Sequence, residues 1–466
     1  MSRSGPIATM ALLTAGLGLA ATDEPLADAR RLEQTIQQAI AKAEPSIACL
    51  LVYRGQTPVD NRFDRNGTDT ESKVPDYFGS GVVISSQGLI LTNYHVVRDA
   101  TRIQVRLPGL PEREGAEAHL FAGDNFSDLA VLKLTPSNSP RSLPAISLGN
   151  GETLRKGSFV IAMGHPYAAG FRDGSPSASW GVVSNLRRRL PGSGNEFVRR
   201  ESLSHYDTLI QTDARLQLGQ SGGALLDLEG QLVGLTTAHT ALTGYEASGG
   251  FAMPIDAPVR RVIDVLSRGE EVEYGFLGVQ TNNSLSFRGG KGVAISEAVG
   301  NSPARRAGLR SGDVIVAVNG QPVNDTDEMR LHLECSLAGK KAVLTVLRAG
   351  PDGRQSERMV EVVLAKAQPK PGYASVRPKP VYGLRVDYAS IRSESTIPEG
   401  VIVREFQDPS GGKQPRLNEG DFITHVNGKA VNSPAEFYRE AEPIARAGNP
   451  LRLTIGHQNR RTITLP

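Results

Sequence analysis

The sequence predicts a mainly β protein built from several domains. Its 466 residues suffice for about three domains of ordinary size. Short apolar runs recur along the chain between turn residues, and the 50 glycines and 29 prolines favour turns over long helices. Many short strands of this kind are typical of β-sandwiches and β-barrels.

The N-terminal residues predict export followed by a helix. Residues 1–21 have a basic start at Arg3 and a short apolar stretch, as in a signal peptide, with cleavage expected after Ala20 or near Ala27-Asp28-Ala29. An uncleaved membrane anchor is the alternative. Residues 25–45 predict an amphipathic helix, because apolar side chains recur every three or four positions before Pro45.

Residues 46–268 predict the first β domain. A strand covers residues 46–53, and a hairpin follows at residues 79–93, turning at Ser86-Gln87. A helical pattern over residues 257–266 closes the domain. Nine further strands are expected between them: Ile103–Leu107, Ala116–Ala122, Leu129–Leu134, Phe159–Met163, Trp180–Ser184, Thr208–Thr212, Ala224–Asp227, Gln231–Thr237 and Gly250–Pro254.

The last 200 residues contain an internal repeat. Residues 312–324 match residues 420–432, so that Asp313 corresponds to Asp421, 108 residues later. Each copy has a strand, an Asn-Gly turn that favours a hairpin, a second strand and a helical segment. We expect two small domains of one type at residues 273–366 and 381–466, joined by a Pro- and Lys-rich linker at residues 367–380.

Charge and cysteine content exclude several functions. The net charge of +3 gives no electrostatic basis for nucleic-acid binding, and the run Arg187–Arg189 is expected in a solvated loop. Cys49 and Cys335 each lie in an apolar segment and are expected to be buried free thiols. No Cys/His spacing suggests a metal site, and no cofactor is expected.

One serine-centred stretch suggests acyl-transfer chemistry. Residues 219–225 place Ser221 among glycines, where backbone N–H groups could surround a developing oxyanion. Such a nucleophile needs a base and a carboxylate that orients the base. His95 follows a strand end, and Asp128 directly precedes another strand, whereas Asp124 is the weaker choice. The order His95, Asp128, Ser221 is that of the chymotrypsin-type triad.

These motifs together resemble the HtrA/Deg family of serine proteases. The resemblance rests on residues 79–84, 91–97, 127–133, 164–166 and 210–225. It implies a chymotrypsin-like double β-barrel protease domain followed by two PDZ domains. It also implies an exported, periplasmic, ATP-independent endopeptidase that cleaves unfolded or misfolded proteins, assembles as trimers or their multiples, and binds C-terminal peptides through its PDZ domains.

The resemblance also implies roles for single residues. Ser221 would attack the scissile carbonyl, His95 would carry the proton, and Asp128 would hold the imidazole, with the N–H groups of Gly219 and Ser221 as the oxyanion hole. The chain has Gln220 where the family usually has Asn, and Gln217-Leu218 where it usually has Asn-Pro. Without the proline we expect a more mobile loop and low basal activity that rises on ligand binding or assembly.

Substrate contacts are expected in two places. Residues 234–238 and 249–252 should form the walls of the specificity pocket, with Thr236, Thr237 and Ala238 shaping a shallow pocket for small aliphatic side chains. Arg215 stands where the family usually has a small residue. A buried guanidinium there could favour acidic side chains, and the alternative is that Arg215 points to solvent or pairs with Asp213.

The PDZ-like copies differ in their expected peptide-binding loops. The first copy has a loop with the glycine pattern of a carboxylate-binding loop, formed by Gly275, Phe276, Leu277 and Gly278. The second has Tyr382-Gly383-Leu384, which lacks the second glycine, so we expect it to serve packing or assembly. Two other functions remain open: a proteolytically weak PDZ scaffold or chaperone, and a membrane-tethered regulatory protease.

Overall fold

The computed structural model describes most of the chain outside the N-terminus and several loops. The described residues are 24–55, 75–109, 115–135, 142–188, 208–237, 250–281, 292–351, 354–368, 372–392, 396–407, 417–456 and 460–466. The predicted signal peptide at residues 1–21 and the pocket residue Ala238 lie outside them. Among the described residues, no helix combines the length and hydropathy needed to cross a membrane.

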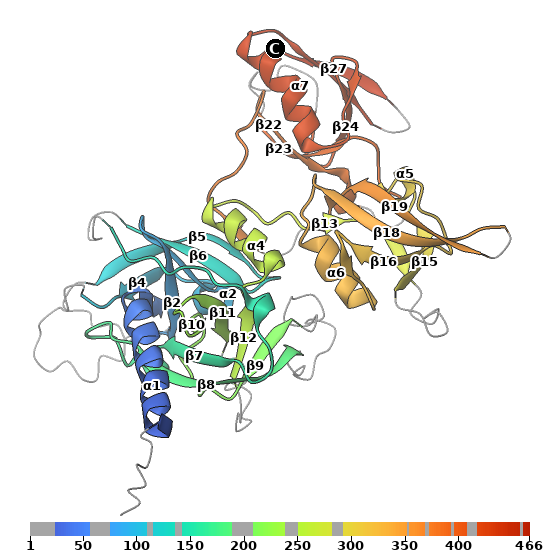
Figure 1. Cartoon of the computed structure of the whole chain (residues 1–466). Coiled ribbons are helices and arrows are strands. Elements are labelled where there is room, and N and C mark those ends of the chain that lie inside the picture. The colour runs from blue at the N-terminus through green and yellow to red at the C-terminus, as the bar shows by residue number, and fades with distance from the viewer. Residues whose placement is uncertain are drawn as a thin grey trace, which may run out of the picture.

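The N-terminal helix leads directly into the first β domain. Helix α1 spans Glu24–Ala43 and ends where Pro45 begins the short 3-10 helix η1 (Glu44–Ser46). Ala39 and Ala43 are buried in the core of the β domain, and Lys42 Nζ donates to the carbonyl of Glu229 at 2.7 Å. The last turns of α1 are therefore packed on the domain, while its first turns project away from it (Figure 1).

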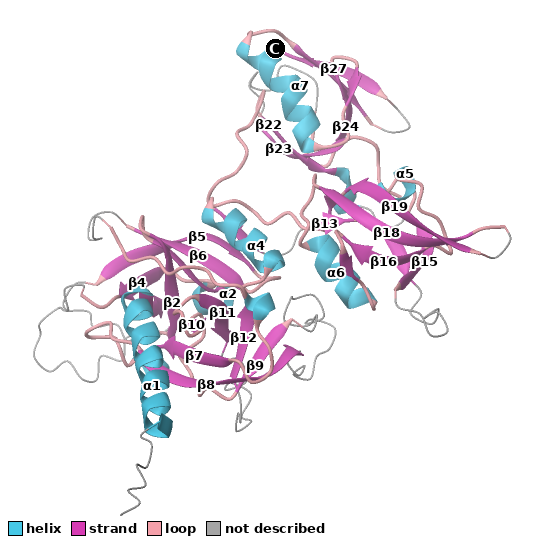
Figure 2. Cartoon of the chain, viewed as in Figure 1, coloured by secondary structure: helices cyan, strands magenta, loops and turns pink. Residues whose placement is uncertain are grey.

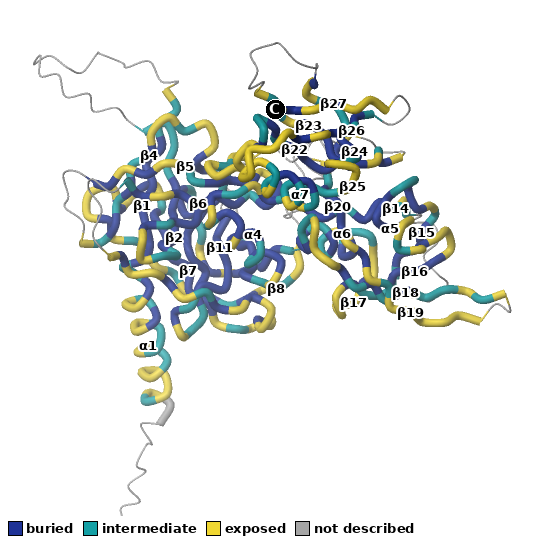
Figure 3. The backbone as a smooth tube through the Cα atoms, turned by 90° about the horizontal axis from the view of Figure 1, so that it is seen from above, coloured by how far each residue is buried: buried dark blue, intermediate teal, exposed yellow. Residues whose placement is uncertain are grey.

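The first β-barrel contains six strands that close into a ring. The strand order is β5-β4-β1-β2-β3-β6, and β6 also pairs with β5. The core of this barrel takes side chains from alternate positions of these strands, such as Ala48, Leu50 and Val52. Strands β1, β2 and β6 are coloured mostly as buried in Figure 3. The strands are β1 (Ile47–Tyr53), β2 (Tyr77–Ser85), β3 (Leu89–Asn93), β4 (Arg102–Arg106), β5 (Ala116–Asp124) and β6 (Leu129–Leu134), with the short helix α2 (Tyr94–Val97) after β3.

The second β-barrel is also closed, in the order β10-β11-β12-β9-β8-β7. Helix α4 (Ala257–Ser267) follows it and is capped at its N-terminus by Asp256, whose side chain accepts from Val259 N. Strand β8 extends through Arg187 and Arg188, which corrects the expected loop at this position, and Arg187 pairs with Glu328. The strands are β7 (Phe159–Gly164), β8 (Ser177–Arg188), β9 (Leu209–Thr212), β10 (Ala224–Leu226), β11 (Leu232–Thr237) and β12 (Gly250–Pro254).

The two repeat copies have the same strand order. In the first repeat unit (residues 273–366) the sheet runs β14-β15-β16-β18-β19, with β17 on β16. In the second repeat unit (residues 381–466) it runs β22-β23-β24-β26-β27, with β25 on β24. Each unit carries one longer helix, α6 (Thr326–Glu334) or α7 (Pro434–Arg446) (Figure 2). The repeat found in the sequence is thus a repeat of topology.

The first unit begins with β13 (Gly275–Phe276), β14 (Val279–Thr281), β15 (Val293–Ala298), α5 (Pro303–Arg306), β16 (Val314–Val318) and β17 (Gln321–Pro322). It ends with β18 (Lys341–Ala349), β19 (Gln355–Val363) and β20 (Ala365–Lys366), which pairs with β13. The second unit contains β22 (Leu384–Tyr388), η9 (Ala389–Arg392), β23 (Val401–Phe406), β24 (Phe422–Val426), β25 (Lys429–Ala430), β26 (Leu451–Ile455) and β27 (Arg461–Leu465).

The segment between the repeat units returns to the first barrel. Gly372–Ala374, within the range expected as a linker, forms strand β21 and pairs antiparallel with β5. Ser375 N donates to the carbonyl of Phe121 at 3.1 Å, and Val376 N donates to that of Gly269 at 2.9 Å. A strand pairing of this kind limits the freedom of the segment, so at least this part is attached rather than a free spacer.

The first repeat unit is also joined to the barrels by buried side chains. Tyr274 is 2% exposed, packs edge-on against Phe126 with ring centroids 4.6 Å apart, and donates its hydroxyl to Asp124 Oδ2 at 2.5 Å. Cys335 belongs to the same apolar cluster, and Arg261 Nε donates to its carbonyl at 2.6 Å. Cys49 and Cys335 are both buried free thiols, as expected.

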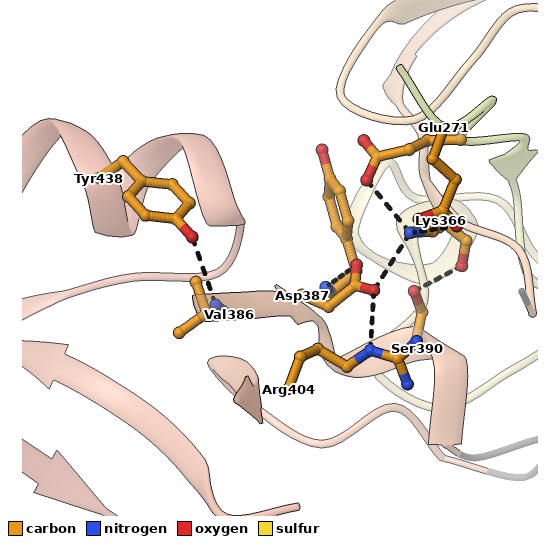
Figure 4. Close-up of polar contacts among 9 residues, drawn as sticks. Glu271, Lys366, Val386, Asp387, Ser390, Arg404 and Tyr438 are labelled. Atoms are coloured by element: carbon orange, nitrogen blue, oxygen red, sulfur yellow. Dashed lines mark hydrogen bonds and ion pairs between the residues drawn. The ribbon is translucent and has the colours of Figure 1, made fainter. Parts of the chain in front are cut away.

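A buried lysine joins the two repeat units (Figure 4). Lys366 Nζ lies 3.1 Å from carboxylate oxygens of Glu271, Glu273 and Asp387, and the lysine side chain is 3% exposed. Burial alone would lower the pKa of Lys366, but the three carboxylates raise it above its usual value. Ser390 Oγ donates to the carbonyl of Lys366 at 2.6 Å. The charged form of Lys366 is therefore held at this junction.

His165 is buried where the two barrels meet. It follows strand β7 of the second barrel, is 0% exposed, and its Nε2 lies 3.5 Å from the carbonyl of Ile47 in the first barrel. Burial lowers the pKa of His165 to about 4. The folded protein therefore keeps this histidine neutral at pH values where the unfolded chain would bind a proton.

Stability should fall on acidification because of His165. Between pH 6.5 and 4 the imidazole of His165 binds a proton in the unfolded chain but stays neutral in the folded chain. About 3 kcal/mol of unfolding free energy should therefore be lost as pH falls through this window. Urea unfolding at several pH values checks this. His165→Gln should lose less stability over the window, while His119→Gln, at an exposed position, should behave as wild type. Equal pH dependence in His165→Gln and wild type would contradict the account.

Candidate active site

Strand pairing in the first barrel brings His95 to Asp128. Strands β3 and β6 pair with Asn93 opposite Leu129, so the residues just beyond these positions are neighbours. His95 Nδ1 lies 2.7 Å from Asp128 Oδ2, and His95 N donates to Asp128 Oδ1 at 2.9 Å. The Asp128 carbonyl accepts from Tyr94 N at 2.9 Å. An aspartate in this place makes Nδ1 the protonated ring nitrogen, which leaves the lone pair on Nε2.

Asp124, the weaker choice, has a structural environment instead. Its Oδ2 accepts from Ser127 N at 2.7 Å, Ser127 Oγ at 2.6 Å and Tyr274 OH at 2.5 Å. Burial raises the pKa of Asp124, although these hydrogen bonds oppose the shift. Asp124 thus fixes the turn that precedes Asp128 and ties that turn to the first repeat unit.

Ser221 is held against the first barrel by Ser80 of strand β2. Ser80 N donates to the carbonyl of Ser221 and Ser80 Oγ to that of Gly219, both at 2.8 Å. Thr92, near the end of β3, donates its hydroxyl to the carbonyl of Ser80 at 2.7 Å. A Cβ on Gly222 would lie 2.3 Å from both Ser80 O and Thr92 Oγ1, so this contact requires glycine. The serine of one barrel is therefore fastened beside the strand that leads to His95.

The residues before Ser221 form a tight turn. Gln220 N donates to the carbonyl of Gln217 at 3.0 Å, Gly219 has φ +96°, and Leu218 has no positive φ, which together define a type II turn. Tyr167 N donates to the carbonyl of Leu218 at 2.8 Å. In a trans peptide the N–H points opposite to the C=O, so this bond fixes the direction of the Gly219 N–H.

The peptide plane between Gln220 and Ser221 is fixed in the same way. The carbonyl of Gln220 accepts from Thr236 Oγ1 at 2.6 Å and from Gly223 N at 3.0 Å. Because the Ser221 N–H belongs to that peptide, its direction is set as well. Two backbone donors with preset directions are what stabilisation of an oxyanion needs.

The predicted pocket residues divide into two groups. Thr236 and Thr237 are buried on strand β11, and the Thr236 hydroxyl is used on the Gln220 carbonyl, a contact that the sequence analysis missed. Arg215 is exposed, so a buried guanidinium is not found, and its carbonyl accepts from Ser179 Oγ at 2.9 Å. Asp213 Oδ1 accepts from Val182 N at 2.6 Å. A role for these residues in the pocket stays a prediction.

The two repeat units differ at the edge strand that could receive a peptide. Gly275 and Phe276 form β13, Leu277 and Gly278 follow, and the edge strand β14 comes next. A Cβ on Gly278, which has φ +78°, would lie 2.4 Å from Ser302, so the loop depends on glycine there.

In the second unit, side chains cap the outer N–H groups of edge strand β22. Val386 N donates to Tyr438 OH at 3.4 Å, and Tyr388 N donates to Asp387 Oδ1 at 2.8 Å (Figure 4). Residues two apart in a strand face the same side. Asp387 is also the carboxylate that binds Lys366. The outer N–H groups of Val386 and Tyr388 on β22 are therefore already hydrogen-bonded to side chains of the same chain.

Comparison with known proteins agrees with this architecture. Residues 79–235 match the trypsin-like peptidase domain family, and residues 275–362 match the PDZ domain family. A probable periplasmic serine endoprotease DegP-like of Pseudomonas fluorescens is 33% identical over 387 residues, which cover 79% of this chain and 74% of that protein. The periplasmic pH-dependent serine endoprotease DegQ of Escherichia coli is 31% identical over 368 residues, which cover 77% of this chain and 74% of DegQ.

Among solved structures, the HtrA-type protease AlgW with a tripeptide is 28% identical, with a TM-score of 0.49 and coverage of 74% of this chain and 98% of AlgW. The two periplasmic relatives are each more than 30% identical and match more than two thirds of this chain. The chain therefore belongs to the HtrA/Deg family of serine endoproteases, with a trypsin-like double-barrel domain and a PDZ domain.

Proposed function

We propose that this endopeptidase is exported to the periplasm, where it cleaves unfolded or misfolded proteins without ATP. The observation that carries the catalytic part is the His95–Asp128 pair beside a serine loop whose peptide planes are fixed. The location is supported by the names of the relatives and by the signal-like sequence of residues 1–21. Family resemblance also supports a trimer or a multiple of trimers as the assembly.

Each residue of the triad has a separate task in this proposal. Ser221 Oγ attacks the carbonyl carbon of the scissile peptide, and His95 Nε2 takes the serine proton and passes it to the leaving amine. Asp128 keeps Nδ1 protonated and stabilises the imidazolium that forms. Water then attacks the acyl-enzyme, with His95 again as the base, and Ser221 is released.

The Gly219 and Ser221 N–H groups would receive the negative oxygen of each tetrahedral intermediate. Loss of one donor in such a site typically costs about 3 kcal/mol of transition-state stabilisation. The bonds from Tyr167 N and Thr236 Oγ1 are supports for these donors, because they orient the carbonyls on the same peptide planes. Donors set before the reaction need no reorganisation during it.

The repeat units would divide peptide binding and packing between them. The first PDZ domain would capture a C-terminal carboxylate at residues 275–278 and pair the peptide with β14. The second unit, proposed here as a second PDZ domain, would serve packing, because its edge strand is capped by Tyr438 and Asp387. We propose domain limits of 46–268, 273–366 and 381–466, with the signal peptide at residues 1–21, the helix at residues 25–45 and an attached linker at residues 367–380.

The triad is tested by digestion of a denatured protein, followed on gels. Ser221→Ala should abolish cleavage, and Asp128→Asn should lower kcat about 10⁴-fold because the imidazole loses its orienting carboxylate. Asp99→Asn, which removes the same charge from a side chain 76% exposed, should cleave at the wild-type rate. Cleavage by Ser221→Ala, or no cleavage by wild type under any condition, would overturn the proposal.

The supporting role of Thr236 is tested by an isosteric pair. Thr236→Val removes the donor to the Gln220 carbonyl and should lower kcat about tenfold, the value of one ordinary hydrogen bond, with KM little changed. Thr236→Ser keeps the hydroxyl and should retain most of the activity. If both variants lost activity equally, a pocket-shaping role would explain Thr236 better.

Peptide binding is tested by titration calorimetry with a peptide ending in an apolar residue. One peptide should bind per chain, and its C-terminal amide should bind at least tenfold more weakly because the carboxylate is lost. A stoichiometry of two would show that the second unit also binds. Equal affinity for the acid and the amide would remove the carboxylate loop at residues 275–278 from the account.

A further inference from the structure

We propose that Gln220 is a positioning residue of the oxyanion hole, whose side chain closes the turn that carries the Gly219 N–H. The inference rests on the proposed function and concerns the residue directly before the nucleophile. No task for this glutamine follows from the sequence alone, and the more mobile loop expected from the sequence rested on the absence of a proline at residue 218.

Gln220 is bonded to Gln217 at two places. Its backbone N donates to the Gln217 carbonyl at 3.0 Å, and its Oε1 accepts from Gln217 N at 2.6 Å. The side chain thus turns back along the loop and meets the N–H of the residue three positions earlier. Together the two bonds hold the backbone N–H and the carbonyl of Gln217. The backbone of Gln217 therefore cannot rotate independently of Gln220.

The site around the Gln220 side chain is built to receive it. Gln220 is 3% exposed, although glutamine side chains are mostly exposed in folded proteins. A Cβ on Gly164 would lie 3.3 Å from Gln220 Cγ and 2.9 Å from Ser80 Oγ, so a larger residue there would crowd the glutamine. The buried amide oxygen has a definite partner in Gln217 N, as a buried polar atom requires.

The length of the side chain is matched to the task. Asparagine is one methylene shorter, so on the same backbone its amide oxygen would not reach the position from which Gln220 Oε1 accepts from Gln217 N. In addition, a proline at residue 218 would remove no hydrogen bond, since none among the described residues uses the Leu218 N–H. Proline fixes φ near −65° and is common at this second position of a type II turn.

These features make Gln220 an alternative to a proline in the turn. A proline would restrict the turn through φ of residue 218, whereas Gln220 restricts it through a hydrogen bond to residue 217. Either restraint favours the turn that presents the Gly219 N–H, and without both the bond from Tyr167 N would be left to hold the peptide plane of Leu218 and Gly219.

The test compares Gln220→Met, which keeps side-chain length without an acceptor, with the double variant Gln220→Met plus Leu218→Pro. Hydrolysis of a denatured protein should show kcat reduced about tenfold in the single variant, with KM and the pH profile of kcat/KM unchanged because the His95–Asp128 pair is intact. The proline should restore most of kcat, which a purely structural defect would not show.

Controls separate this inference from the proposed function. Gln321→Met, at an exposed position in the first repeat unit, should cleave as wild type. If Gln220→Met does not fold, as judged by its unfolding midpoint, Gln220→Asn takes its place with the same expectation. Wild-type kcat in the single variant, or no recovery with proline, would overturn the role of Gln220. An inactive wild type would instead count against the proposed function.

Discussion

The hydrogen bonds of Ser80 are the interaction on which the catalytic arrangement depends. Ser80 belongs to strand β2 of the first barrel, and its N–H and hydroxyl hold the carbonyls of Ser221 and Gly219. The same hydroxyl accepts from His165 N of the second barrel at 2.8 Å. Through this residue the barrel that positions His95 and Asp128 is joined to the barrel that carries Ser221, so the proposed triad depends on the interface and on neither barrel alone.

The rest of the chain extends this rigid centre outward. Tyr274 places the start of the first repeat unit against Asp124, four residues before Asp128, and strand β21 fastens the following linker to β5. Lys366 then joins the first unit to the second. The units are connected to the protease domain by buried and hydrogen-bonded contacts, which are more restrictive than the semi-rigid spacer that a proline-rich linker suggests.

The sequence was sufficient for the fold class and the repeat, and it singled out the His95–Asp128 pair that the structure brings together, because each depends on short local patterns. A strand that ends before His95 and a strand that begins after Asp128 are visible as short apolar runs, and the Asn-Gly turns mark both repeat units. The supports could not be predicted in this way. Thr236 and Gln220 act through contacts with backbone atoms whose positions depend on tertiary packing, and the pairing of Gly372–Ala374 with β5 joins segments about 250 residues apart.

The central claim is that the turn at residues 217–220 already directs the Gly219 N–H into the oxyanion hole when no ligand is bound. The rate of labelling of Ser221 by a fluorophosphonate, measured on the full chain with and without a saturating C-terminal peptide, tests it most directly. Because Tyr167, Thr236 and Gln220 already fix the turn, the two rates should agree within about threefold. A rise of about a hundredfold on peptide addition would show that the turn forms only on binding, as the missing proline first suggested, and would contradict the account.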